Sequence, residues 1–208
     1  MKLPMLKAHR KRAFTLVELL VTVSIIGVLI GILLPVLAST RKVVQRTTCA
    51  SNLRQIGISI QAHRTDYKDR LPTARYMPKP FLSVDTDPGL PEAMKAYLPF
   101  KQGKSNAVWQ CPDDEVVFQL SGTSYDYVSM FSGQRPKDIF FIKLGFADES
   151  QIILSRDFDN ASADIEGSQE PIDVPSRHLR RNNLWLDGRV EVIEHAAPIK
   201  VETEEDDA

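Results

Sequence analysis

Residues 14–34 read FTLVELLVTVSIIGVLIGILL, and these 21 residues contain a single ionisable side chain, Glu18. As an α-helix that rises about 1.5 Å per residue, the stretch would span roughly 30 Å, the thickness of the hydrocarbon core of a bilayer. The thirteen residues before it carry no acid and five basic side chains, Lys2, Lys7, Arg10, Lys11 and Arg12. Because basic flanks stay in the cytoplasm, we expect residues 1–13 inside, one membrane span, and the rest outside.

The composition excludes several broad classes of protein. Of the 208 residues, 43% are apolar and 25% are charged, so neither a fully disordered chain nor a membrane protein with many spans fits. The net charge is −1, and it would be near −6 without the five basic residues of the N-terminal segment. A negatively charged folded part disfavours nucleic acid as a partner. Residues 201–208 are expected to form a solvated acidic tail.

A secretory signal peptide is the main alternative for the N-terminal segment. Val36, Leu37 and Ala38 have the small-residue spacing of a signal-peptidase site. However, the apolar run is longer than the usual 7 to 15 residues or so of a signal peptide. Glu18 would also cost on the order of a few kcal/mol at membrane depth, and a signal peptide gains nothing from it. We therefore expect Glu18 to have a function and a partner.

Residues 11–18, KRAFTLVE, resemble the cleavage and methylation motif of type IV prepilins and type II secretion pseudopilins. The resemblance implies that a prepilin peptidase cuts between Ala13 and Phe14 and methylates the new amine, although Ala13 stands where the family prefers glycine. Pro35 falls at the position of the family's helix-kinking proline. The Phe14 amine would be a cation in the bilayer, and Glu18 is the nearby anion. Four residues apart on one helix, the two could pair within a subunit, but the amine can also meet Glu18 of a neighbour, and we expect that contact to set the register of assembly.

After Pro35 the pattern becomes amphipathic. Apolar and aromatic residues recur three or four positions apart, at Cys49, Leu53, Ile56, Ile60, His63 and Tyr67. This spacing predicts one face of a helix, residues 35–68, which packs on a globular domain. The proline should kink the helix without ending it. No metal-ligand spacing surrounds His63, so we expect it to be a partly buried structural residue, and we expect Tyr67 to belong to the core.

Residues 69–200 are expected to form the globular domain, which begins with a proline-rich connection and a short helix near residues 92–97. Strand-like runs follow at residues 107–111, 115–120, 125–131, 139–143 and 151–155. The strongest strand pattern is the last, where Asp187 and Gly188 separate two alternating runs as a two-residue hairpin turn. We therefore predict an α+β fold of the pilin-like kind, with one long N-terminal helix packed on a small antiparallel sheet.

A second resemblance involves His178, Asp187 and Gly188, together with residues 49–67 and 111–113. These segments resemble the pseudopilin-like proteins of planctomycetes and related bacteria, whose motif has nine residues between a histidine and Asp-Gly; here eight residues separate them. A catalytic dyad of His178 and Asp187, with Ser155 or Ser176 as nucleophile, is the alternative. No glycine-flanked serine elbow supports catalysis, and the turn already explains Asp187.

Other candidate sites are weaker. Cys49 and Cys111 lie on the expected non-cytoplasmic side, and they form either a disulfide between helix and sheet or two neighbouring free thiols. Neither has a CxxC neighbour, so zinc is not expected. Residues 157–160, DFDN, resemble the start of a calcium loop, but Ala161 stands in place of a third oxygen ligand. We expect an exposed acidic turn there and no cofactor.

The resemblance to prepilins implies the function. The chain would be a single-pass protein of the inner membrane with its C-terminal domain in the periplasm. Its expected partners are a prepilin peptidase, other pilin-like subunits and the secretion assembly platform, and its product is a type II secretion pseudopilus or a type IV pilus-like fibre. An enzyme is not expected. Two alternatives stay open: a surface or periplasmic binding protein exported through prepilin processing, and a hydrolase tethered by the same helix.

Overall fold

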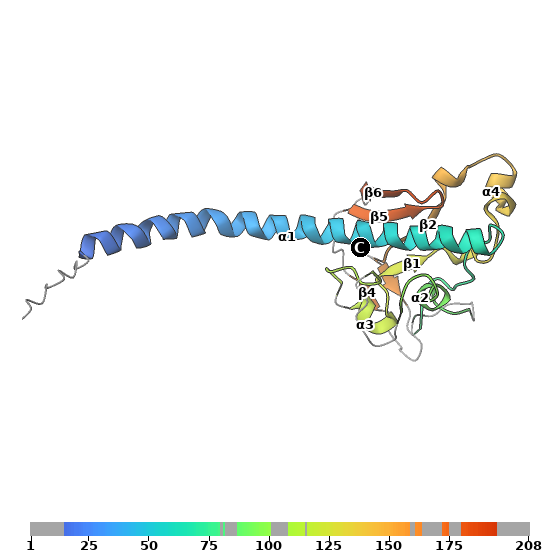
Figure 1. Cartoon of the computed structure of the whole chain (residues 1–208), viewed down its shortest axis with the longest axis horizontal. Coiled ribbons are helices and arrows are strands. Elements are labelled where there is room, and N and C mark those ends of the chain that lie inside the picture. Colours follow the sequence, from blue (N-terminus) through green and yellow to red (C-terminus); the bar gives the residue numbers. More distant parts are fainter. Residues whose placement is uncertain are drawn as a thin grey trace, which may run out of the picture. The chain divides into compact units, whose positions relative to one another are not determined.

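The computed structural model describes residues 15–79, 81, 87–100, 108–114, 116–158, 161–163, 172–174 and 180–194. The chain divides into two compact units, Met1–Val43 and Val44–Ala208, which are described separately. Helix α1 (Leu16–Asp66) has 51 residues and runs through both units (Figure 1). In the first unit it follows Thr15, and in the second unit it is the first element. Pro35 lies inside α1, so the helix continues through the proline as expected.

The amphipathic stripe of α1 forms one wall of the core of the second unit. Four of its residues are completely buried: Cys49, Leu53, Ile56 and Ile60. His63 is half-buried, and its Nδ1 lies 3.1 Å from the carbonyl oxygen of Arg70. The expectation that Tyr67 belongs to the core is wrong, because α1 ends at Asp66 and Tyr67 is 57% exposed, stacked on His63 with ring centroids 4.3 Å apart.

Four antiparallel strands form the main sheet, in the order β1-β2-β5-β6: Tyr125–Tyr127 (β1), Ile153–Asp157 (β2), Arg180–Trp185 (β5) and Val190–Glu194 (β6). A second sheet consists of two antiparallel strands, β3 (Ala161–Ala163) and β4 (Ile172–Val174). The pairing of β2 with β5 contains an irregularity between Ile153 and Ser155, typical of a β-bulge. The predicted α+β architecture, a long helix on a small antiparallel sheet, is confirmed.

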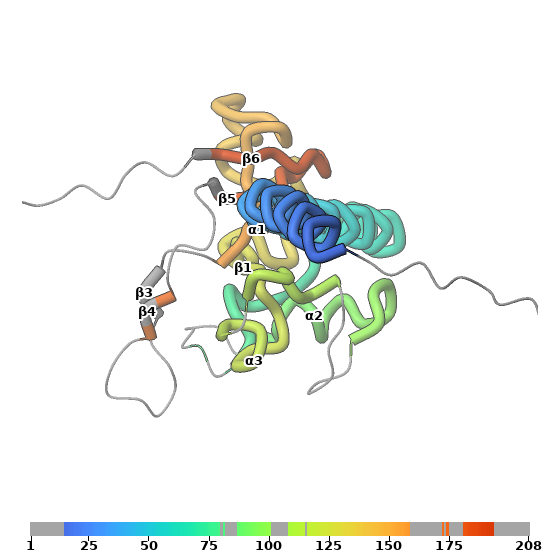
Figure 2. Tube along the Cα trace, turned by 90° about the vertical axis from the view of Figure 1, so that its left-hand side faces the viewer, coloured from blue at the N-terminus to red at the C-terminus, as the bar shows by residue number. Residues whose placement is uncertain are grey.

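Helix α1 lies very close to the main sheet. Figures 1 and 2 both show its second half running alongside β1 and β5. Gly57 faces Leu184 of β5, and a Cβ added at Gly57 would lie only 2.7 Å from Leu184 Cδ1. The hydroxyl of Tyr125 in β1 donates to the carbonyl oxygen of Cys49 at 3.4 Å. Burying a large apolar side chain contributes about 1.5 to 3 kcal/mol relative to exposure. The packing of α1 on the main sheet is therefore a major source of stability.

The hairpin around Asp187 and Gly188 is present, but its loop has three residues instead of two. The backbone N–H of Trp185 donates to the carbonyl of Arg189 at 2.8 Å, and that of Gly188 donates to the carbonyl of Trp185 at 2.9 Å. Gly188 has φ +89°, the left-handed conformation that closes a three-residue hairpin. The extra loop residue is Leu186, which is completely buried and is therefore held by the core.

Three of the predicted strands are wrong. Residues 108–111 form turns and irregular backbone, while α3 (Val117–Ser121) and α4 (Phe140–Lys143) are short helices. Helix α3 forms because the carboxylate of Asp114 accepts hydrogen bonds from three backbone N–H groups, those of Val116, Val117 and Phe118. Such capping stabilises the first turn of a helix, and a short apolar run does not reveal it. Helix α4 is anchored by Ile139, which is buried just before it.

The remaining elements are short. Only the first half of the expected strand at residues 125–131 is a strand, and a 3₁₀ turn η1 (Ser129–Phe131) follows it. Likewise, 3₁₀ turn η3 (Glu149–Gln151) occupies the start of the run expected at residues 151–155. A further turn, η2 (Pro136–Asp138), precedes α4, and the expected helix near residues 92–97 is instead α2 (Leu90–Ala93), with Pro91 in its first turn.

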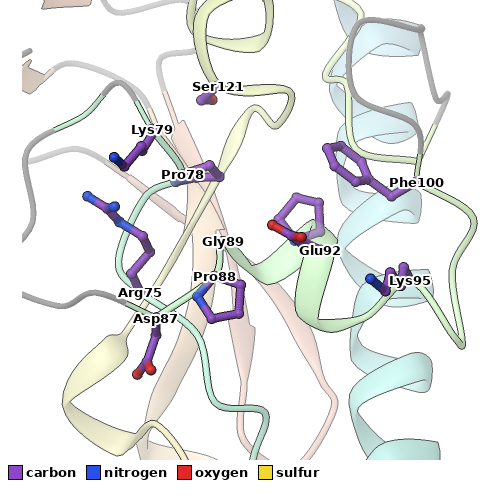
Figure 3. Close-up of a pocket in the computed structure, with 11 residues that line it drawn as sticks. Arg75, Pro78, Lys79, Asp87, Pro88, Gly89, Glu92, Lys95, Phe100 and Ser121 are labelled. Carbon is purple, nitrogen blue, oxygen red and sulfur yellow. The ribbon is translucent and has the colours of Figure 1, made fainter. Parts of the chain in front are cut away.

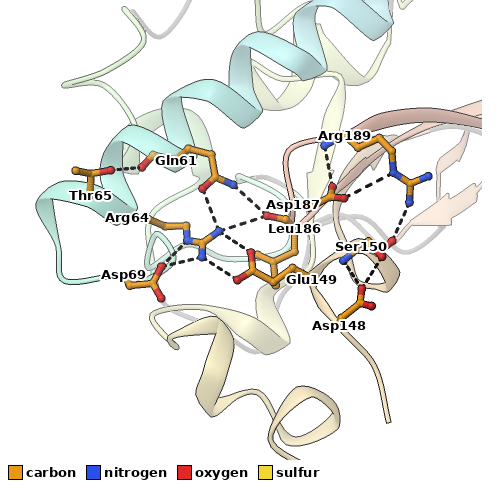
Figure 4. A network of polar contacts seen from close by, with 10 residues as sticks. All are labelled: Gln61, Arg64, Thr65, Asp69, Asp148, Glu149, Ser150, Leu186, Asp187 and Arg189. Atoms are coloured by element: carbon orange, nitrogen blue, oxygen red, sulfur yellow. Dashed lines mark hydrogen bonds and ion pairs between the residues drawn. The ribbon is translucent and has the colours of Figure 1, made fainter. Parts of the chain in front are cut away.

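Arg64 joins the end of α1 to the hairpin and to η3 (Figure 4). Its guanidinium contacts both carboxylate oxygens of Glu149, at 2.9 and 3.1 Å, and donates to Asp69 at 2.8 Å. Gln61 donates to the carbonyl of Leu186 at 3.0 Å. Burial opposes the charge on Arg64, but its hydrogen bonds with Glu149 and Asp69 outweigh burial and raise its pKa. This network fixes the helix end against the sheet.

Candidate functional site

Helix α1 begins with a capping box made by Thr15 and Glu18. The Oε2 atom of Glu18 accepts hydrogen bonds from the backbone N–H of Thr15 at 2.9 Å and from its hydroxyl at 2.8 Å. In return, the backbone N–H of Glu18 donates to the Thr15 hydroxyl at 3.2 Å. The arrangement satisfies backbone donors that a helix otherwise leaves open at its start, and it places a negative charge at the positive end of the helix dipole.

The capping box gives Glu18 a role within one chain that the sequence interpretation missed. The spacing T-x-x-E at residues 15–18 is the pattern that could have identified Thr15. Both hydrogen bonds from Thr15 go to the same carboxylate oxygen, Oε2. A carboxylate accepts several hydrogen bonds through its two oxygens, so Glu18 can hold its own helix turn and still accept another donor at Oε1.

The first half of α1 presents apolar side chains on all its faces. By length and composition it is the one helix within the described ranges that could cross a membrane, and none of its most apolar window is buried within the chain. Its hydroxyl groups are hydrogen-bonded to the helix itself: Thr22 donates to the carbonyl of Leu19 and Ser24 to that of Leu20, both at 2.8 Å. These bonds make the hydroxyls compatible with hydrocarbon, where no water can satisfy them.

The structure places some of the predicted site residues and not others. Glu18 and Pro35 both lie within α1. Ala13 and Phe14, the predicted cleavage position, lie outside the described residues, as does His178. Cleavage, methylation and any role of His178 therefore stay predictions.

Cys49 and Cys111 form a disulfide; their Cα atoms are 4.9 Å apart, and their sequence separation is 62. Both residues are buried. The sequence suggested that Cys111 ends a strand, but Cys111 lies in an irregular loop. This loop is also held by Asn52 of α1, whose side-chain amide donates to the carbonyl of Gln110 at 2.8 Å. The disulfide therefore joins α1 to a loop, not to the sheet.

Asp187 is used by the hairpin turn. Its Oδ1 accepts a hydrogen bond from the backbone N–H of Arg189 at 2.9 Å. Ser155, one of the nucleophiles considered from the sequence, is completely buried in β2 and donates its hydroxyl hydrogen to the carbonyl of Asp126. Ser176 lies outside the described residues. Ser155 is therefore closed to solvent, and Asp187, although exposed, has a structural role in the turn.

The predicted acidic turn at residues 157–160 is wrong in its first residue. Asp157 ends β2, where it is 1% exposed, and its Oδ2 accepts hydrogen bonds from the backbone and side-chain amides of Asn182, at 3.1 and 2.6 Å. Asp159 and Asn160 lie outside the described residues. Within the parts that the structure describes, no group of three or more His, Cys, Asp or Glu side chains could hold a metal ion.

A buried ion pair, which no sequence pattern indicated, lies between β1 and β2. Asp126 is 1% exposed and accepts hydrogen bonds from Arg156 at 2.8 Å and from the hydroxyl of Tyr76 at 3.1 Å. Burial raises the pKa of Asp126, and the charge of Arg156 opposes this effect. Side chains alternate along β1, so Asp126 lies on the opposite face of the sheet from Tyr125 and Tyr127. The ion pair of Asp126 and Arg156 therefore holds the loop around Tyr76 against that face.

These features define a class of protein: a globular α+β domain on a helix of membrane length, with a carboxylate fixed in the first turn of that helix. Residues 8–34 match the family model of the prokaryotic N-terminal methylation motif. That motif marks type IV prepilin-like proteins, so the resemblance of residues 11–18 to prepilins is confirmed. No curated protein matches the chain, and no solved structure does. The more specific resemblance to planctomycete proteins stays a prediction.

Proposed function

We propose that the chain is a membrane-anchored, pilin-like subunit. After a prepilin peptidase cuts between Ala13 and Phe14, it assembles with other pilin-like subunits on a secretion platform, into a type II secretion pseudopilus or a type IV pilus-like fibre. One observation carries the proposal: the methylation motif at residues 8–34 coincides with a membrane-length helix that holds Glu18 in its first turn.

The assembly step would pair the two charges of the mature N-terminus. Cleavage creates a cationic amine at Phe14, which needs an anion in a medium of low dielectric constant. Glu18 supplies this anion, since Thr15 occupies only Oε2 and leaves Oε1 to receive the amine of a neighbouring subunit. The capping box would keep the carboxylate in a fixed orientation, so that the amine meets it in one register.

The proposed topology places the globular unit in the periplasm. The five basic residues before the apolar helix favour a cytoplasmic N-terminus. A disulfide such as Cys49–Cys111 is typical of an oxidising compartment and rare in the cytosol, which supports the same orientation.

We also propose that the chain is not an enzyme. The serine and aspartate that suggested a hydrolase have structural roles, since Ser155 is buried and Asp187 caps a turn. A binding protein that uses prepilin processing only for export would share the N-terminal features, and would differ in not entering a fibre.

The test is to express the full-length chain in its native host and to analyse both membranes and sheared fibres. Mass spectrometry should find a mature chain that begins with a methylated Phe14, and the same species should be present in the fibre fraction. A mature chain that begins at Ser39 would mean an ordinary signal peptide and would overturn the proposal. Correct cleavage without any fibre-associated protein would favour the exported binding protein.

A further inference from the structure

The globular unit contains a pocket of about 470 Å³ beside α2 (Figure 3). Its walls come from the segment around Arg75 and Pro78, from α2 with its flanking turns, and from Ser121 at the end of α3. Proline rings and the ring of Phe100 provide apolar surface, while charged side chains of both signs line the rest. Its volume lies in the range of roughly 300 to 1,000 Å³ that is typical of pockets for small ligands.

Arg75 is the unusual residue of this pocket. It is 7% exposed, and its only described side-chain hydrogen bond runs from Nη2 to the carbonyl of Phe81, at 2.8 Å. Its Nε has no hydrogen-bond partner. None of the ion pairs among the described residues involves its guanidinium. Arginine is almost never buried without an anionic partner, because removing its charge from water is expensive. An anion that enters the cavity from outside would therefore stabilise this buried cation.

The backbone around Arg75 is rigid, which makes the pocket preformed. The N–H of Arg75 donates to the carbonyl of Pro88 at 3.0 Å, and Arg75 forms a β-bridge with Gly89. Gly89 packs closely against Pro78, because it has no side chain; a Cβ added at Gly89 would lie 2.6 Å from Pro78 Cγ. Prolines on both segments fix the backbone further. A site that is preformed in this way loses little conformational freedom when a ligand binds.

We propose that this pocket binds a carboxylate on a small apolar body, with the carboxylate at Arg75 and the body against the proline rings. The planar guanidinium matches the geometry of a carboxylate. Asp87 and Glu92 also line the pocket, so a single negative charge is favoured over the double charge of a phosphate. Lys79 and Lys95, both exposed, add positive charge to the lining. This proposal goes beyond fibre assembly and does not depend on it.

Two sources could supply this chemistry: a free small acid, or the C-terminal carboxylate of a peptide. Binding would be measured by saturation-transfer NMR on the full-length protein in lipid nanodiscs. The probes are benzoate for the free acid and the tripeptide Gly-Gly-Phe, with its amidated form as control. Benzyl alcohol tests the apolar body without the charge, and inorganic phosphate tests the charge without the body.

We expect saturable binding of benzoate, of Gly-Gly-Phe or of both, and which of them binds more tightly identifies the source. Benzyl alcohol, amidated Gly-Gly-Phe and phosphate should bind at least tenfold more weakly. Absence of saturable binding by both carboxylate probes would overturn the proposal. Phosphate binding as tight as that of benzoate would overturn it as well, because the apolar body would then contribute nothing.

Two variants test the part played by Arg75. Arg75→Met should weaken binding of the carboxylate probes at least tenfold, while the unliganded protein should melt at the same temperature or higher, since a buried unpaired charge is removed. Arg54→Met makes the same chemical change on an exposed face of α1 and should leave binding unchanged. Equal binding by wild type and Arg75→Met would overturn the proposal.

Lys95→Glu provides a test that does not alter the core, because Lys95 is exposed. The added negative charge should weaken binding of both carboxylate probes several-fold and should leave the melting temperature unchanged. If Arg75→Met fails to fold, this variant decides the question: unchanged binding by Lys95→Glu would then contradict a carboxylate site in this pocket.

Discussion

Glu18 has two tasks that substitution can separate. Gln at this position still accepts the hydrogen bonds of a capping box, so Glu18→Gln should insert into the membrane and be cleaved normally. It lacks the charge that the proposed contact with the Phe14 amine needs, and leaving one buried charge unpaired costs on the order of 3 kcal/mol. We expect its amount in sheared fibres to fall by about tenfold or more, measured relative to processed protein in the membrane.

Thr22→Ala is the matched control for this experiment. Among the residues that the structure describes, the Thr22 hydroxyl bonds only to the carbonyl of Leu19 within its own helix. Its loss should therefore change neither processing nor incorporation. Normal incorporation of Glu18→Gln would contradict the charge-pairing role. Failure of that variant to insert would instead mean that the first half of α1 is not a membrane anchor.

Tyr97 should make stability sensitive to alkali. Its hydroxyl donates to Asp66 at 2.7 Å, and this hydrogen bond, more than burial, raises the pKa of Tyr97 to about 12. Because the pKa in the folded state is above the unfolded value near 10, the stabilising contribution is complete below about pH 10 and is lost as the pH rises through about 12.

The measurement is urea unfolding of the full-length protein in detergent at several values between about pH 9 and pH 12. The free energy of unfolding of wild type should fall more steeply with pH than that of Tyr97→Phe, which keeps the ring but has no proton to lose. Parallel curves for the two proteins would show that the Tyr97–Asp66 bond does not contribute in this range.

At the scale of elements, the contact between α1 and β5 depends on Gly57. Gly57→Ala would place a methyl group 2.7 Å from Leu184 Cδ1, and Leu184 is completely buried, so it has little room to move. We expect a loss of about 1 to 3 kcal/mol in the free energy of unfolding, despite the better helix propensity of alanine. Urea unfolding followed by near-UV circular dichroism would measure it.

Gly27→Ala is the control, because no atom lies within 4 Å of a Cβ added at Gly27. This variant should be neutral or slightly stabilising. If the clash with Leu184 is the cause, adding Leu184→Val to Gly57→Ala should recover part of the loss. Equal stability of Gly57→Ala and wild type would mean that the helix shifts on the sheet at no cost.

The elements differ in how well the sequence predicted them. The stripe on α1 was visible because Cys49, Leu53, Ile56 and Ile60 repeat with the helical period, and the hairpin because Asp187 and Gly188 mark a turn. The short runs failed for a physical reason. Helix α3 depends on a cap from Asp114, which lies three residues before the first residue of the helix. A short apolar run also fits a buried helix turn as well as a strand.

Predictability was also uneven across the candidate site. The N-terminal motif could be recognised because its residues are contiguous. The pairing of Asp126 with Arg156 and the isolation of Arg75 depend on segments brought together only by folding, so no local pattern announced them. Thr15 was predictable in principle from its spacing to Glu18, since a capping box is a local motif.

For the whole molecule, the disulfide should decide how well the globular unit survives. Replacing both cysteines, Cys49→Ala with Cys111→Ala, opens a loop closed across 62 residues and should cost about 2 to 5 kcal/mol. Urea midpoints of the double variant and of reduced wild type should agree with each other and lie below that of oxidised wild type. Coincident midpoints for all three would mean that the bridge adds no stability.

The position of this bridge also has a mechanical consequence. Any tension pulled through the apolar half of α1 enters the globular unit at Val44 and reaches Cys49 within about two helical turns, before it reaches Leu53, Ile56 or Ile60. At Cys49 the disulfide connects α1 to Cys111, so part of the force passes through a covalent bond. This bond does not break under forces that separate a helix from a sheet. A subunit built in this way can be dragged by its anchor while the core behind the bridge stays folded.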